Sequence, residues 1–131
     1  MGFSEGCKLA GLATGRKKIK PAGLVLAACF PDDTDSGDAD WSKDRRWYEK
    51  TMNRANGITM PTLLLSNKAD SKSNTNSHEL AQVLTNQATP VITERIPGKA
   101  GHEIFYDHTA PWVNTVSKFI RHQKPYQKLF N

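Results

Sequence analysis

The stretch that decides the fold is Ala22-Gly23-Leu24-Val25-Leu26-Ala27-Ala28-Cys29-Phe30, which has a proline on each side. This apolar run has the length of a strand and shows no polar alternation, which is typical of a strand covered on both faces. A later stretch, Thr62-Leu63-Leu64-Leu65, predicts a second buried strand. Residues Val91 to Ile96 predict a third strand.

The segments between these strands carry helix signals. The Leu- and Ala-rich residues 7–13 predict a short buried helix, and the amphipathic residues 41–56 predict a surface helix. Asn76 and Glu79 form a capping box, which predicts that the next helix begins there. Apolar residues at helical spacing in 111–120 predict a last helix.

Helices that alternate with buried strands indicate a parallel sheet with helices on both faces. We predict an α/β fold, a three-layer sandwich with a mostly parallel sheet. The 131 residues fit one domain, 1–131. Residues 32–58 form a possible cap or insertion, in which Trp41, Trp47 and Tyr48 either cover a substrate pocket or belong to an ordinary surface helix.

Composition excludes several classes of function. The 18 Lys+Arg and 13 Asp+Glu give a formal net charge of +5, but the cations are scattered and match no nucleic-acid module, so a nucleic-acid partner is not expected. No stretch approaches the roughly 20 apolar residues of a membrane span. The N-terminus lacks the layout of a signal peptide, which predicts a cytoplasmic protein. Cys7 and Cys29 are accordingly expected to be reduced thiols that act as small apolar fillers.

Three polar residues stand at places where chemistry is expected. Gly2-Phe3-Ser4-Glu5-Gly6 matches the pattern G-x-S-x-G, in which a tight strand-to-helix turn exposes the serine hydroxyl. Asp70 follows the second predicted strand, and His102 follows the third. Because ligands collect at the carboxyl ends of strands in open α/β sheets, these loops can converge.

This order of Ser, Asp and His resembles the α/β-hydrolase superfamily, specifically its carboxylesterase, lysophospholipase and acyl-protein thioesterase branch. The fungal-type serine hydrolases are a close second. The resemblance rests on residues 2–6, 23–30, 61–70 and 101–104, and it covers only the C-terminal half of that fold. The family's earlier strands, including the strand that delivers the serine, are expected to be missing, which leaves a three-stranded sheet.

The resemblance implies that Ser4 is the nucleophile, Asp70 the orienting acid and His102 the general base. The backbone N–H of Glu5 would then donate to the oxyanion. The substrate would be a carboxylic ester or thioester, cleaved through an acyl-enzyme, with no metal or organic cofactor. Residues 33–38 hint at a calcium loop, but the spacing is one residue short and no bidentate Glu follows.

Plainer explanations stay open for each site residue. Ser4 fits a helix N-cap, Asp70 a turn residue, and His102 a surface-loop histidine, with His108 as its competitor for the role of base. His78 and His122 fall within predicted helices and are expected to face solvent. The alternative function is a noncatalytic hydrolase remnant that pairs with another chain, or with its own copy, through an open sheet edge.

Overall fold

The structure is a computed structural model of the whole chain, and it describes residues 1–3, 5–29, 49–99 and 101–123. Within these residues four parallel strands form one sheet in the order β1-β2-β3-β4. The strands are β1 (Gly2–Phe3), β2 (Leu24–Ala27), β3 (Thr62–Asn67) and β4 (Val91–Ile96). The helices are α1 (Glu5–Gly15), α3 (Ser71–Asn86) and α4 (Trp112–Arg121), with short 3-10 helices η2 (Ala55–Gly57) and η3 (Gly101–Tyr106). The predicted α/β class with a parallel sheet is therefore confirmed.

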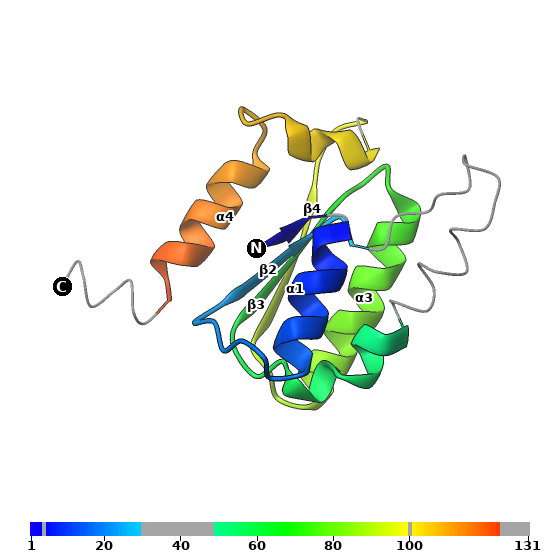
Figure 1. Cartoon of the computed structure of the whole chain (residues 1–131). Coiled ribbons are helices and arrows are strands. Elements are labelled where there is room, and N and C mark those ends of the chain that lie inside the picture. Colours follow the sequence, from blue (N-terminus) through cyan, green and yellow to red (C-terminus); the bar gives the residue numbers. More distant parts are fainter. Residues whose placement is uncertain (4, 30–48, 100, 124–131) are drawn as a thin grey trace.

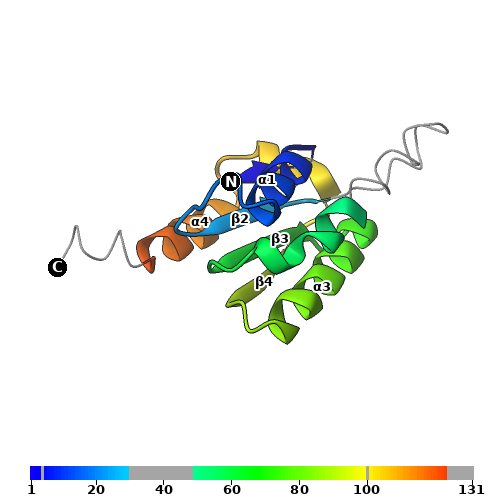
Figure 2. The ribbon, with the colours of Figure 1, turned by 60° about the horizontal axis from the view of Figure 1, so that its bottom comes forward.

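The sheet has helices on both faces, as Figures 1 and 2 show, with α1 and α3 on one side and α4 on the other. Alternate residues of the central strands enter two separate cores. Leu26 and Leu64 pack with Leu80 and Leu84 of α3, whereas Leu63 and Leu65 belong to the core that includes Phe119 of α4. Because neither face of β2 or β3 meets water, these strands need the continuous apolar runs seen in the sequence.

The expectation of three strands, with none delivering Ser4, is wrong. Gly2 and Phe3 form β1, which pairs in parallel with Leu26 and Ala27 of β2. Two residues are too few to show a strand period, so no sequence pattern marks them. They become a strand because the edge of β2 offers backbone partners.

The predicted start of α3 is also wrong. The helix begins at Ser71 rather than near Asn76, because Asp70 is its N-cap and accepts a hydrogen bond from the backbone N–H of Ser73. The first turn is rich in Ser and Asn, which favour caps and turns over helix interiors. With Asp70 as its cap, the helix includes Ser73 in its first turn, and Ser73 is buried there.

The expectation of reduced thiols is wrong as well, because Cys7 and Cys29 form a disulfide. Their Cα atoms lie 5.4 Å apart although 22 residues separate them in the sequence. The β1–α1–β2 crossover brings the first turn of α1 over the end of β2, where both cysteines are buried.

Most of the predicted cap lies outside the described residues, and so do Trp41, Trp47, Tyr48 and the acidic residues 33–38. The described part of that segment contributes Ala55 and Ile58 to the core on the α1 and α3 face.

Candidate functional site

The chain around Ser4 has the strand-to-helix arrangement that a nucleophile elbow needs. Strand β1 ends at Phe3 and α1 begins at Glu5, while Ser4 itself lies outside the described residues. A Cβ on Gly2 would lie 2.6 Å from the carbonyl oxygen of Gly6, so only glycine fits here without a shift. A Cβ on Gly6 would meet no described atom within 4 Å. The close approach expected of the motif is thus found at its first glycine.

Glu5 is the first residue of α1. The first backbone N–H groups of a helix have no partner within the helix, and they point out of the helix at its N-terminal end. The predicted oxyanion donor is therefore at a position where a backbone N–H is available to a ligand by helix geometry.

Asp70 lies three residues beyond the carboxyl end of β3 and caps α3. Its Oδ1 accepts the Ser73 N–H at 3.1 Å, and its Oδ2 is buried. The N-terminal end of the α3 dipole favours a negative charge at this place. The plainer explanation, a local structural role, is thus correct for one carboxylate oxygen, and it does not conflict with a second role for the other.

The loop that carries Asp70 is held by polar side chains of β3 and α3. The Nδ2 of Asn74 donates to the carbonyl oxygens of Asn67 and Lys68, at 3.0 and 3.3 Å, and Ser66 Oγ donates to Asn74 Oδ1. The first turn of α3 is therefore fastened to the last residues of β3. This fixes the backbone on both sides of Asp70.

His102 is the second residue of η3, which follows the carboxyl end of β4. The structure describes its backbone but not its side chain. η3 lies beyond the end of β4 in Figure 1, close to where β3 turns toward α3. The loops of Asp70 and His102 thus leave the same edge of the sheet from neighbouring strands.

Asn67, the last residue of β3, joins those two loops directly. Its Oδ1 accepts the backbone N–H groups of Ala69 and Gly101, each at 3.0 Å, and its Nδ2 donates to the carbonyl oxygen of Ile96 at 2.9 Å. The side chain is fully buried. Sequence reasoning missed this residue because its partners lie 29 and 34 residues away.

Aromatic contacts join the Ser4 end of β1 to η3. The ring of Phe3 lies 5.7 Å from that of Phe105 and 5.4 Å from that of Tyr106, measured between centroids. Phe105 in turn lies 6.0 Å from Trp112 at the start of α4. The residue before Ser4 and the helix that contains His102 therefore pack against each other.

The other three histidines of the chain are exposed. His78 on α3 and His122 at the end of α4 are exposed, as predicted, and His108 is exposed between η3 and α4. Next to His108, hydrogen bonds from the Thr109 side chain and backbone N–H lower the pKa of Asp107, and the charge of His108 adds to this effect.

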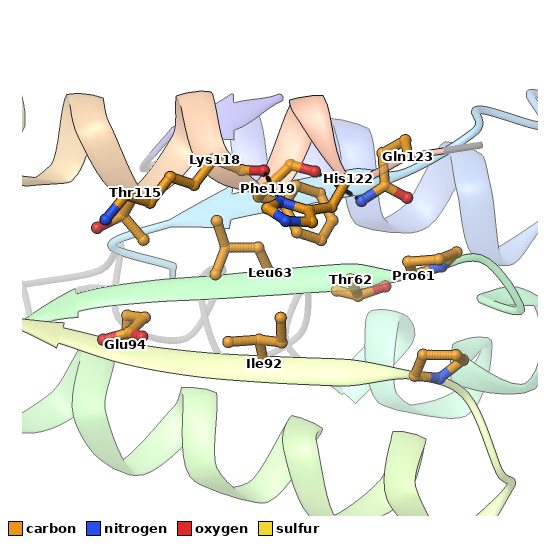
Figure 3. Close-up of a pocket in the computed structure, with 11 residues that line it drawn as sticks. Pro61, Thr62, Leu63, Ile92, Glu94, Thr115, Lys118, Phe119, His122 and Gln123 are labelled. Atoms are coloured by element: carbon orange, nitrogen blue, oxygen red, sulfur yellow. Dashed lines mark hydrogen bonds between the residues drawn. The ribbon is translucent and has the colours of Figure 1, made fainter. Parts of the chain in front are cut away.

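A groove of about 390 Å³ lies at the other end of the sheet, between α4 and the strands β3 and β4. Figure 3 shows Leu63 and Ile92 on one side of it, with Lys118 and Phe119 of α4 and the adjoining His122 on the other. Pro61 and Pro90, which directly precede β3 and β4, also line it. The groove is therefore remote in the fold from the carboxyl ends of the strands, and it is not the predicted site.

Within the described part of the chain, no group of three or more His, Cys, Asp or Glu side chains is placed to hold a metal ion. The described helices are all too short or too polar to cross a bilayer.

Comparison with known proteins gives no relative from which a role can be taken. No family model matches the chain, and neither a curated protein nor a solved structure matches it.

Proposed function

We propose that the chain is a serine hydrolase that cleaves a carboxylic ester or thioester through an acyl-enzyme, with Ser4 as nucleophile, Asp70 as orienting acid and His102 as general base. The observation that carries the proposal is the parallel sheet: the segments of Ser4, Asp70 and His102 follow β1, β3 and β4 at one edge. Ligands collect at this edge in open α/β sheets. The order Ser, Asp, His along the chain is also that of the α/β-hydrolases.

Two features of the fold support a partial α/β-hydrolase architecture. β1 and α1 flank Ser4 closely, and Gly2 makes the tight strand–helix contact that such an elbow requires. The contacts of Phe3 with Phe105 and Tyr106 favour an approach of the Ser4 turn to η3. Both features concern residues that lie next to Ser4 in the chain or in the same short helix as His102.

The proposed reaction proceeds in two balanced steps. Ser4 Oγ attacks the acyl carbon while His102 takes its proton, and the bond to the alcohol or thiol breaks as His102 returns that proton to the leaving group. Water then attacks the acyl-enzyme with the same base, which releases the acid and restores the Ser4 hydroxyl. The Glu5 N–H would donate to the oxyanion in both steps, and loss of one such donor typically costs about 10² to 10³ in rate.

The test is covalent labelling of the purified, folded chain with a fluorophosphonate, followed by intact mass. Ser4 Oγ would attack phosphorus and displace fluoride, so we expect one adduct, on Ser4. Ser4→Ala should abolish it, and His102→Ala should slow it by about 10³-fold or more. Ser117→Ala and His78→Ala on helices α4 and α3 are matched controls that should label like the parent protein. A folded chain that forms no Ser4 adduct would refute the proposal.

The second candidate function is an interaction module that pairs through a sheet edge. The observation that supports it is the exposure of β4. Residues 92–95 of this edge strand are exposed, and Ile92 is 51% exposed. Glu94 and Arg95 are the charged residues that natural edge strands use to prevent pairing. Sedimentation velocity over a range of concentrations separates the two ideas: a dimer that Ile92→Lys disrupts would favour the module, and a monomer at all concentrations would count against self-pairing.

A further inference from the structure

The Asn67 side chain makes three hydrogen bonds at the carboxyl edge of the sheet. Its carboxamide accepts two backbone N–H groups and donates to one carbonyl oxygen, and it is fully buried. Buried amides need such partners, because each unmade hydrogen bond costs about 1–3 kcal/mol. The notable feature is where the partners lie: one is in the Asp70 loop, and two are at the end of β4 and the start of η3.

The turn between β4 and η3 contains two glycines with positive φ, and Asn67 bonds the backbone on either side of this turn. Gly98 and Gly101 have φ values of +123° and +61°, a region that other residues rarely adopt. A Cβ on Gly98 would lie 3.2 Å from Ile104 Cδ1 and 3.9 Å from Asn67 Nδ2. The turn that leads to His102 thus bends at two glycines, and the amide of Asn67 bonds the backbone at both of its ends, Ile96 and Gly101.

We propose that Asn67 is a positioning residue that holds the Asp70 loop and η3 in register, so that the acid and the base of the proposed triad meet. This inference rests on the proposed function. One side-chain oxygen bonds Ala69, adjacent to Asp70, and Gly101, adjacent to His102. A displacement of one loop against the other would then change the geometry between the two catalytic groups.

Gln87 provides a matched control for Asn67, because its side-chain amide also makes three hydrogen bonds but contacts neither the Asp70 loop nor η3 through them. Its Nε2 donates to the carbonyl oxygens of Ala55 and Ile58 and to Thr89 Oγ1, at 2.7, 3.0 and 3.1 Å. Two of these three hydrogen bonds join it to backbone 32 and 29 residues away, but Gln87 caps the end of α3 that precedes β4. Loss of Gln87 should therefore reduce stability without moving the loops of Asp70 and His102.

The experiment measures fluorophosphonate labelling of Asn67→Ala, Asn67→Ser and Gln87→Ala as the maximal rate, kinact, and the half-saturating concentration, KI. Asn67→Ser retains a hydroxyl that can accept the Ala69 N–H but is too short to reach Gly101, so it tests the link between loops if Asn67→Ala fails to fold. Hydrogen exchange of the Gly101 amide reports that link without any need for labelling.

We expect both Asn67 variants to lower kinact by roughly 10- to 100-fold with KI nearly unchanged, because a small misplacement of reacting groups has effects of this size. Exchange at Gly101 should become faster in the same variants. Gln87→Ala should leave kinact, KI and Gly101 exchange at their parental values.

The outcomes distinguish the two proposals. Parental kinact in a folded Asn67 variant would overturn the positioning role alone, and so would an equal loss of kinact in Gln87→Ala. A parent protein that is folded but never labels would overturn the proposed function and this role with it, whatever the exchange at Gly101 shows.

Discussion

Gly2 and Gly6 occupy the two outer positions of one sequence pattern, but their surroundings differ. A methyl group on Gly2 would lie within 2.9 Å of Ala10 Cβ and Cys7 Cα and still closer to Gly6 O, whereas one on Gly6 would lie in open space among the described residues. The pattern therefore combines one glycine that packing requires with one that packing does not.

We expect Gly2→Ala to lower the free energy of unfolding by about 1–3 kcal/mol, because α1 must shift away from β1. Gly6→Ala, the matched control, should be neutral or stabilising by up to about 1 kcal/mol, since alanine favours a helix over glycine. Urea denaturation measures both changes. Equal effects of the two substitutions would contradict the close approach of α1 at Gly2.

The Asp107 carboxylate illustrates a local electrostatic effect at the start of α4. Its Oδ1 accepts the backbone N–H and the hydroxyl of Thr109, at 2.8 and 2.6 Å, and these bonds lower its pKa. A carboxyl whose pKa is lowered by folding stabilises the folded state above its unfolded pKa of about 3.9. That stabilisation is lost as the pH falls through the lowered, folded pKa.

Thr109→Val removes the hydroxyl but keeps the backbone N–H bond, so we expect the pKa of Asp107 to rise part of the way toward its ordinary value. NMR titration of the Asp107 carboxyl carbon measures this shift. Thr115→Val, whose hydroxyl bonds Pro111 O instead, should leave the titration unchanged. An unchanged pKa in Thr109→Val would mean that the hydroxyl bond is not its main cause.

At the scale of elements, the observed role of the Asp70 carboxylate, as the N-cap of α3, can be separated from the role proposed for it in the triad. Asp70 caps the helix, and asparagine caps helices about as well as aspartate does. Asparagine, however, cannot hold a histidine in the tautomer that a hydrolase base needs, and this substitution in a triad costs about 10⁴ in rate. The two roles therefore respond differently to one isosteric change.

Asp70→Asn should leave the free energy of unfolding within about 0.5 kcal/mol of the parent and slow fluorophosphonate labelling by roughly 10⁴-fold. Asp70→Ala should also lose about 1 kcal/mol of stability, since it removes the cap. Thermal denaturation and labelling kinetics on the same samples give both quantities. Parental labelling by Asp70→Asn would reduce Asp70 to a helix cap.

At the scale of the whole molecule, the disulfide closes a loop from the first turn of α1 to the residues just after β2. In the chain-entropy account, a cross-link over such a loop stabilises the fold by about 3 kcal/mol, mainly by restricting the unfolded chain. This contribution is a large fraction of the 5–15 kcal/mol by which native domains are stable.

A reductant should therefore lower the free energy of unfolding in urea by about 3 kcal/mol. The double variant Cys7→Ala/Cys29→Ala should be less stable than the oxidised parent and insensitive to reductant. Alkylation followed by mass measurement checks the redox state of each sample. Two thiols that alkylate in the unfolded, unreduced parent would contradict the cross-link.

Part of this architecture could be predicted from local pattern alone. The apolar runs marked β2 and β3, β4 has the predicted bounds Val91–Ile96, and the helical spacing after Pro111 marked α4. Burial leaves a trace in the sequence wherever an element is long enough to repeat its period against the core. The places of Asp70 and His102 after their strands followed from the same pattern.

Other features depended on residues that meet only after folding. The amino-acid sequence by itself determined the α/β class, because continuous apolar strands that alternate with amphipathic helices need helices on both faces of a parallel sheet to cover them. Tertiary structure decided the pairing of β1 with β2, the Cys7–Cys29 bond, and the link from Asn67 to Gly101. Each of these joins groups at least 20 residues apart, so no local period records it, and only the packing of the sheet and its crossovers brings the partners together.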